Sequence, residues 1–421
     1  MPLTENRFKN IGILLTLILA GEAIFMLPFT IARVFRPTYL QVFDINNFEL
    51  GTCFSYYGIV AMVSYFFGGP LADKYPARNL MAAALWITSL GGLVMATIPE
   101  LAALYIVFAF WGFTTIFLFW AALIKSTREW GGYQFQGRAF GFLEGGRGVM
   151  AGIVGAILLG VFTLLANNPL NPIAETNHFS FQVIILVTAL IVFLVGVLVW
   201  VVVPKSSKSI DPEHALPTAL EIIHVMKLPG VWMQSLIIIC AYVGYKSTDD
   251  FSLYSFEVLN FTEVESAAVT TSSMWLRPIF AILAGFLADK YSGTGVIKIA
   301  FFAMAGGALL IYSGTFEHEA VVMIVIFAAT LTGVFGIRGV YFSIMKEAAI
   351  PLVATGTAVG LISVIGYTPD VFMSPLMGYL LDNNPGPLGH RLVFLVLAVF
   401  AIFGLLVSFV FDRWSARQVA K

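Results

Sequence analysis

Apolar residues along the chain recur in runs of roughly 20, separated by short segments rich in charged residues, glycine and proline. An α-helix of that length crosses a hydrocarbon layer about 30 Å thick. The pattern therefore predicts an all-α, polytopic membrane protein. Twelve transmembrane helices are predicted, near residues 11–35, 50–71, 79–98, 101–124, 139–166, 181–203, 231–256, 266–288, 296–315, 320–345, 352–380 and 391–411.

Basic residues in the loops predict the orientation of these helices. An even number of spans puts both chain ends on one side of the membrane, and most Lys and Arg residues of the loops fall on that side. The opposite loops hold little beyond Arg36 and Arg391. Cytoplasmic loops are enriched in Lys and Arg. We therefore expect an integral protein of a bacterial inner membrane with both termini in the cytoplasm.

The longest polar interruption, PKSSKSIDPEHALP, lies almost midway along the chain and divides it into two halves of six predicted spans each. The sequence predicts an N-terminal six-helix bundle at 1–203, a cytoplasmic linker at 204–230 and a C-terminal six-helix bundle at 231–421.

The two halves are related by sequence. GPLADKY at 69–75 recurs, with one change, as GFLADKY at 285–291. Such a duplication implies two repeats around an axis normal to the membrane. A fainter echo is a glycine thirteen residues before a lysine in the fourth and tenth spans: Gly112 and Lys125, Gly333 and Lys346.

The repeated segment resembles a signature of the major facilitator superfamily, Gly-x-Leu-x-Asp-(Arg/Lys), found between the second and third helices. Here Gly69, Leu71, Asp73 and Lys74 match it. The resemblance covers the whole chain and implies two six-helix bundles that transport by alternating access. Two departures from the full motif are Pro76 in place of the usual glycine and a basic pair reduced to Arg78.

Two further stretches, 136–148 and 365–386, are similar to a YihN-like subgroup near the organophosphate and organic-anion antiporter branch. That branch has a substrate-binding arginine in the seventh helix, and the resemblance puts Lys246 within a residue of it. The cation expected in the first helix is replaced by apolar residues around Met26. This argues against a doubly charged phosphate as substrate.

Composition narrows the function further. Only 11% of residues are charged and 59% are hydrophobic, so lipid must be part of the solvent. The net charge of −1 gives no argument for a nucleic-acid partner. Cys53 and Cys240 lie in different apolar segments and predict neither a disulfide nor a zinc site. With no nucleotide-binding or hydrolase motif in the sequence, we expect no enzyme activity, cofactor or metal.

Ionisable residues at membrane depth are costly and are functional candidates by default. We expect them to line a wet cavity between the two bundles. The predicted spans contain ten of them: Glu22, Arg33, Glu144, Arg147, Lys246, Asp249, Asp250, Arg277, Arg338 and Asp370.

Acidic residues in this set are candidates for proton coupling. In a regular helix Lys246, Asp249 and Asp250 share one face, where a cation beside two carboxylates can exchange partners. Alternatively, Asp250 lies near the outer mouth and caps a gate. Glu22, halfway along the first span, either carries a proton or is paired with a neighbouring helix.

Arg147, Arg277 and Arg338, with Lys246, are candidates for binding an anionic substrate, because guanidinium fits carboxylate, sulfonate or phosphate. Structural pairing is the alternative for each arginine, and Glu144 is placed to hold Arg147. Tyr245 and Tyr367 are candidates for stacking on or hydrogen bonding to the substrate, although most aromatic residues in such a chain serve packing.

The repeated loops are predicted to act in gating. We expect their aspartates to pair with a basic residue such as Arg138 and to hold the cytoplasmic gate shut in one state. The alternative is a loop aspartate that ends a helix. The predicted gating set is Gly69, Asp73, Lys74, Arg138, Gly285, Asp289 and Lys290.

Together these features predict a monomeric secondary transporter of a small polar organic anion, coupled to protons or to a counter-anion. The first alternative is a proton-coupled exporter of amphipathic compounds. The second is a transporter-like sensor that binds ligand and signals to a partner.

Overall fold

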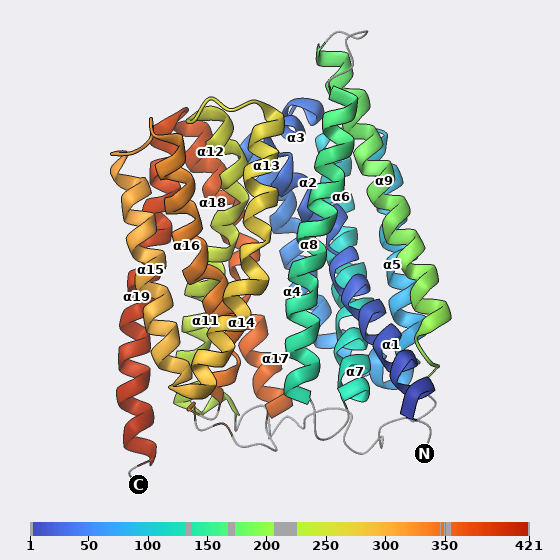
Figure 1. Ribbon diagram of the computed structural model, residues 1–421, viewed down its shortest axis with the longest axis vertical. Helices are drawn as coiled ribbons and strands as arrows, with labels where there is room; N and C mark the ends of the chain where they lie inside the picture. The colour runs from blue at the N-terminus through green and yellow to red at the C-terminus, as the bar shows by residue number, and fades with distance from the viewer. Residues whose placement is uncertain are drawn as a thin grey trace. The chain divides into compact units, whose positions relative to one another are not determined.

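The computed structural model describes residues 3–131, 136–166, 173–205, 225–345, 347–348, 350 and 355–419. Every regular element among them is a helix, which confirms the all-α prediction. The helices form two compact units (Figure 1). Unit 1 comprises Met1–Ile45, Thr52–Ala215 and Glu263–Trp275, and unit 2 comprises Asn46–Gly51, Leu216–Thr262 and Leu276–Lys421.

In unit 1 the first predicted span is divided into a long helix and two short elements, whereas the second, third, fifth and sixth are each one long helix. Its elements are α1 (Leu3–Ala23), η1 (Met26–Thr30), α2 (Ile31–Val34), α3 (Arg36–Phe43), α4 (Asn47–Lys74, beyond its first turn), α5 (Ala77–Ala96), α6 (Leu101–Gly112), η2 (Phe113–Trp120), α7 (Ala121–Gly131), α8 (Gln136–Ala166), α9 (Ile173–Val202) and α13 (Glu263–Met274).

In unit 2 the seventh and eleventh predicted spans are each divided, whereas the ninth and twelfth are continuous. Its elements are α11 (Pro229–Ser247), η4 (Thr248–Asp250), α12 (Phe251–Glu257), α14 (Leu276–Lys290), α15 (Gly293–Ser313), α16 (Ala320–Val340), η5 (Ser343–Met345), α17 (Thr355–Gly366), α18 (Pro369–Asn383) and α19 (Pro387–Val419).

Two segments pack away from the half of the sequence to which they belong. The first turn of α4 packs in unit 2, where Asp382 accepts hydrogen bonds from the backbone amides of Asn47 (3.0 Å) and Phe48 (2.6 Å). Helix α13 packs in unit 1, where Gly152 leaves room for the ring of Trp275. The predicted bundle boundaries at 203 and 231 stay a prediction.

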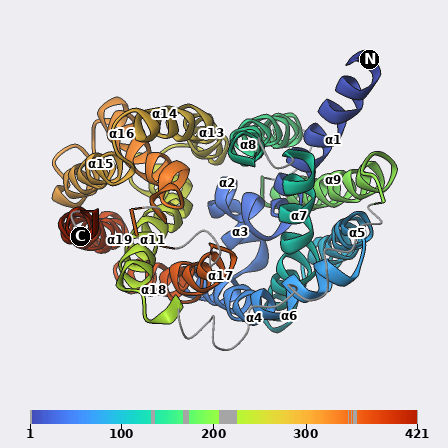
Figure 2. The same ribbon diagram turned by 90° about the horizontal axis from the view of Figure 1, so that it is seen from below.

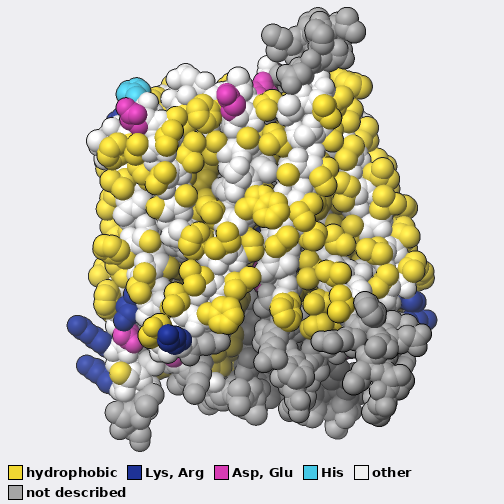
Figure 3. Space-filling model, in the orientation of Figure 1, with side chains coloured by type: hydrophobic (Ala, Val, Ile, Leu, Met, Phe, Trp, Pro, Cys, Tyr) yellow, Lys and Arg dark blue, Asp and Glu magenta, His cyan; other side chains and the backbone are white. Residues whose placement is uncertain are grey.

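Apolar surface on the helices agrees with a lipid environment. Nine helices in the described residues are long and apolar enough to cross a membrane, or ten if the bent pair Ile11–Ala23 and Met26–Val34 is one span. Hydrophobic side chains cover the helices along most of their length in Figure 3, and charged ones lie near helix ends. Leu164 (79%) and Val321 (77%) are among the most exposed, which water would penalise.

The candidate residues sit on helices held from several sides within their own unit. In unit 1, α1 packs against α7, α8 and α9. In unit 2, α11 packs against α16, α17, α18 and α19 (Figure 2). Both α1 and α11 therefore present polar side chains to neighbouring helices and not only to lipid.

Candidate functional site

Among the residues that the structure describes, each unit contains a group of ionisable side chains around a buried lysine or arginine. We call the group in unit 2 the Lys246 cluster, and it consists of Lys246, Asp249, Asp370, Arg338, Tyr242 and Tyr245. We call the group in unit 1 the Arg147 cluster, and it consists of Arg147, Glu22, Glu144, Phe25 and Trp120.

Two broken helices build the Lys246 cluster. Lys246 lies in the last turn of α11, just before the chain tightens into the 3-10 turn η4. Asp370 lies in the first turn of α18, which begins at Pro369. Pro369 has no amide hydrogen to donate to a preceding carbonyl, which interrupts the helical hydrogen bonds after α17. A cation at a helix C-terminus and a carboxylate at a helix N-terminus both complement the helix dipole.

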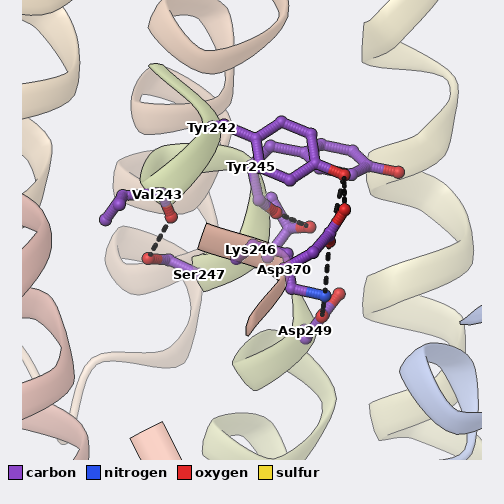
Figure 4. Close-up of polar contacts among 8 residues, drawn as sticks. Tyr242, Val243, Tyr245, Lys246, Ser247, Asp249 and Asp370 are labelled. Carbon is purple, nitrogen blue, oxygen red and sulfur yellow. Dashed lines mark hydrogen bonds and ion pairs between the residues drawn. The ribbon is translucent and has the colours of Figure 1, made fainter. Parts of the chain in front are cut away.

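Lys246 lies between two carboxylates (Figure 4). Its Nζ is 3.4 Å from Oδ2 of Asp249 and 3.6 Å from Oδ1 of Asp370, and the residue is only 1% exposed. The hydroxyl of Tyr242 donates to Asp370, at 3.1 Å from each carboxylate oxygen. A buried cation this close to two acids has its charge compensated, as burial requires.

Aromatic rings lie beside this group of charges. The guanidinium of Arg338, in the last turn of α16, is 3.8 Å from the ring centroid of Tyr245. The rings of Tyr242 and Tyr367 are 4.9 Å apart, and the hydroxyls of Tyr367 and Tyr341 are 3.2 Å apart. The cluster thus combines two cations with aromatic faces and hydroxyl groups, which suits an organic molecule carrying a negative group.

The structure corrects the predicted common face of Lys246, Asp249 and Asp250. Asp249 contacts Lys246, but Asp250 points to His390 of α19, with Oδ2 at 2.8 Å from Nδ1. The reason is the 3-10 geometry of η4. With three residues per turn, positions i and i+3 eclipse and position i+4 turns away.

His390 is a residue that the sequence patterns did not single out. It is fully buried in the first turn of α19, with Asp250 on Nδ1 and Oε2 of Glu257 at 3.0 Å from Nε2. In the sequence it stands in a loop-like segment after Gly386 and Pro387. The available signal was a histidine in a chain with two carboxylates about two helical turns apart, at 250 and 257.

The Arg147 cluster joins α1 to α8. Nη1 of Arg147 is 2.6 Å from Glu144 on the same helix, and Nε is 3.5 Å from Glu22. The rings of Phe25 and Trp120 lie 5.5 and 5.7 Å from the guanidinium carbon. For Arg147 the sequence allowed either substrate binding or a structural ion pair, and the pairing with Glu144 is that ion pair. Contact with substrate stays a prediction.

Irregular helix segments position those two rings. Phe25 precedes the π-helical segment η1, and Trp120 ends the π-helical segment η2. Pro28 lies within η1 and has no amide hydrogen to donate. Single-turn π segments inside helices often occur at functional sites. Both irregular segments of unit 1 therefore border its charged cluster.

The remaining candidates are only partly described. Arg277 is half-buried at the second residue of α14, Gly285 is half-buried and Lys290 is exposed. Their proposed roles stay predictions. The side chains of Asp73, Lys74, Arg138 and Asp289, and Gly69 itself, lie outside what the structure describes, although their backbones are helical.

Lipid-exposed helices with charged clusters inside each unit define a polytopic membrane protein of the transporter class. A model of the Major Facilitator Superfamily matches residues 18–369. The chain belongs to that superfamily, and it is a transporter with the corresponding twelve-helix fold.

Two relatives come from Escherichia coli (strain K12). Inner membrane protein YihN is 29% identical over 401 residues, covering 93% of each chain. Inner membrane protein YqcE is 27% identical over 402 residues, covering 92% of this chain and 91% of the relative. These relatives confirm the resemblance to a YihN-like subgroup.

Solved structures share the fold. A bacterial homolog of the human lysosomal transporter Spinster, inward-facing and unoccupied, has a TM-score of 0.75 with 13% identity, covering 97% of this chain and 98% of the other. A mutant of the nucleoside transporter NupG has a TM-score of 0.70 with 14% identity, covering 96% and 98%. At this identity the likeness shows the fold alone.

Proposed function

We propose that this protein moves a small polar organic anion, of carboxylate, sulfonate or sugar-phosphate type, across the inner membrane by alternating access. The observation that carries the proposal is the shared position of Lys246 between Asp249 and Asp370, with Arg338 on the ring of Tyr245 nearby. Two cations in aromatic surroundings fit an organic anion.

An arriving anionic group competes with a carboxylate for Lys246. The displaced Asp249 or Asp370 is then a buried charge without its cation, and binding a proton removes that cost. Proton-coupled transport follows directly from this exchange. In the alternative mode a second anion replaces the first, and Lys246 is never left without a negative partner.

The orientation and location are part of the proposal. Basic residues on one side of the predicted spans support a cytoplasmic location for both termini. Both relatives are named as inner membrane proteins, which supports the same membrane for this chain.

Thermal unfolding of the purified protein tests the anion site, with panels of carboxylates, sulfonates and sugar phosphates. A ligand that binds only the folded state raises its stability, by about 2.7 kcal/mol at a hundredfold excess over Kd. We expect Lys246→Ala and Arg338→Ala to lose this shift. Lys298→Ala is the matched control, because Lys298 is also ion-paired in unit 2, at 2.7 Å from Asp412 outside the cluster.

Proteoliposome uptake at two pH values then tests transport by the same ligand. Stabilisation by organic cations or amphipathic drugs alone would contradict the proposal and favour an exporter. Binding without counterflow of labelled ligand would instead favour a sensor.

A further inference from the structure

Asp250, His390 and Glu257 form a second polar group in unit 2, which we call the His390 triad. His390 and Asp250 are both 0% exposed, and the side chain of Glu257 is 35% exposed. The triad connects three elements, since Asp250 ends η4, Glu257 ends α12 and His390 lies in the first turn of α19. The proposed exchange of anionic partners at Lys246 does not involve the triad.

Hydrogen bonding in the triad fixes how many protons it must hold. Each ring nitrogen of His390 faces a carboxylate oxygen, at 2.8 Å for Asp250 and 3.0 Å for Glu257. A neutral imidazole has one donor and one acceptor nitrogen, and an ionised carboxylate only accepts. Both contacts are hydrogen bonds only if two protons lie between the three groups. Imidazole is a stronger base than a carboxylate, which places both protons on the ring.

The surroundings agree with a charged ring. Besides the two carboxylates, the ring of Tyr254 faces His390, with its centroid 5.2 Å away. The next residue along the chain, Arg391, is paired with Glu317. That pair balances its own charge, with 2.6 Å between Oε2 and Nη2. Among the described residues no group donates a hydrogen bond to the buried Oδ1 of Asp250, and the histidine is the cation that compensates this carboxylate.

The triad is joined to the Lys246 cluster through the backbone. Asp249 and Asp250 are consecutive residues of η4, the first contacting Lys246 and the second contacting His390. If the hydrogen bond between His390 and Asp250 is lost, the peptide unit that joins Asp250 to Asp249 is therefore free to move. No other covalent path between the two groups is as short.

We propose that the His390 triad is a proton-binding site that ties η4 and α12 to α19. With its second proton bound, the ring donates to both carboxylates and holds the break in the seventh helix. Loss of that proton leaves one carboxylate facing a bare ring nitrogen, and the η4 turn is released. The release reaches Asp249 and Lys246 through the backbone, so the protonation of the triad controls the exchange at Lys246 without supplying the coupled proton, a step that rests on the proposed function.

Nitrogen NMR of histidine-labelled full-length protein in detergent tests the proton site without any substrate. His390→Gln identifies the signals of His390 among the five histidines of the chain. At pH 7.5 we expect protons on both ring nitrogens of His390, each of which faces a carboxylate oxygen. A bare nitrogen on His390 at this pH would overturn the proposal.

Neighbouring aspartates supply a matched pair of variants. Asp250→Asn removes the negative charge that faces Nδ1 of His390. We therefore expect one ring nitrogen of His390 to lose its proton at pH 7.5. Asp249→Asn makes the same change one residue away and leaves both protons in place. The same number of ring protons on His390 in both variants would contradict the assignment of Asp250 as the carboxylate that holds the second proton.

Amide hydrogen exchange tests the tie between the elements. Glutamine at position 390 can donate to one carboxylate but not to both, so one charge-assisted hydrogen bond is lost. We expect exchange in 248–257 to become about tenfold faster in His390→Gln, with α15 unchanged as the internal control. Unchanged exchange in 248–257 would show that the triad does not hold the break.

The two proposals fail separately. Loss of anion binding in Lys246→Ala concerns the proposed function, whereas the NMR and exchange experiments concern only the triad. A protein that binds no organic anion but keeps a doubly protonated His390 would refute the first and retain the proton site.

Discussion

At the scale of residues, the clusters differ in how their charges are compensated. Lys246 is nearly inaccessible and lies close to two acids, whereas Arg147 has one buried partner and one whose side chain is 47% exposed. Breaking a buried ion pair is costly because the remaining charge stays in apolar surroundings, whereas an exposed pair is screened. The same type of substitution should therefore have very different effects at different members of the clusters.

The two glutamates around Arg147 test this difference. Glu22 has a side chain that is 8% exposed, and Glu144 is the exposed partner. We expect Glu22→Gln to destabilise unit 1 by a few kcal/mol and Glu144→Gln by less than about 1 kcal/mol. Thermal unfolding in detergent measures both. Equal losses in the two variants would show that burial does not govern this cluster.

The hydroxyl of Tyr242 supports Asp370 directly. Tyr242→Phe removes the donor at 3.1 Å from the carboxylate and keeps the ring, so we expect a loss of about 1.5–3 kcal/mol, the range for a hydrogen bond to a charged group. Tyr312→Phe removes a hydroxyl from an exposed ring of α15 and should change stability by less than about 0.5 kcal/mol. Indistinguishable unfolding temperatures for the two variants would contradict the assigned bond.

At the scale of elements, the sequence predicted the helices better than their interruptions. Each of the twelve ranges predicted from apolar runs and intervening glycine, proline and charge contains helix in the part of the chain that the structure describes. The break at Thr248–Asp250 has no glycine or proline to mark it, and a regular helix put Asp250 on the wrong face. Pro369 did mark the break before α18, but only packing between α11 and α18 brings Asp370 to Lys246.

The weak repeat of a glycine thirteen residues before a lysine has a physical basis in helix packing. A Cβ at Gly112 would meet the carbonyl oxygen of Tyr57, and one at Gly333 would meet that of Ala300. Lys125 donates to the carbonyl of Ala72 at 2.8 Å, next to the repeated loop. Close backbone approach therefore accounts for both glycines, whereas nothing lies within 4 Å of a Cβ at Gly285.

Alanine at two glycines of unit 2 separates packing from helix propensity. At Gly333 a Cβ would also lie 2.9 Å from the amide nitrogen of Met304, so Gly333→Ala should force α15 and α16 apart and cost about 1–3 kcal/mol. Gly306 has open space around it, and Gly306→Ala should stabilise α15 by up to about 1 kcal/mol. Thermal unfolding of the variants should show shifts of opposite sign, and a matching loss at both positions would refute the packing argument.

At the scale of the whole molecule, the repeat and the apolar runs were enough to predict the family and its twelve-helix fold, since both depend on pattern. Pairing of the charges depends on which helices meet, and no pattern in one sequence gives that. The predicted pocket between the bundles and the roles of Arg277 and the repeated loops stay predictions. The histidine triad was missed because His390 lies 140 residues from Asp250 and 133 residues from Glu257 in the chain.

Charge compensation in the Lys246 cluster predicts the stoichiometry of transport. If the anion takes the place of one carboxylate and that carboxylate binds a proton, one proton enters with each substrate molecule, and the net charge moved is zero for a singly charged anion. Uptake by proteoliposomes should then follow an imposed pH gradient and ignore an imposed membrane potential, whose effect is about 2.3 kcal/mol per charge at 100 mV. The substrate for this measurement is whichever anion stabilises the protein.

Asp370→Asn separates the proton step from substrate binding. Asparagine cannot release or bind the coupling proton, yet Asp249 still contacts Lys246. We therefore expect gradient-driven uptake to be lost while exchange of labelled for unlabelled anion continues, because exchange never requires Lys246 to be without an anionic partner. Uptake driven by the potential in the native protein, or gradient-driven uptake that survives in both Asp370→Asn and Asp249→Asn, would exclude these carboxylates as the groups that carry the coupled proton.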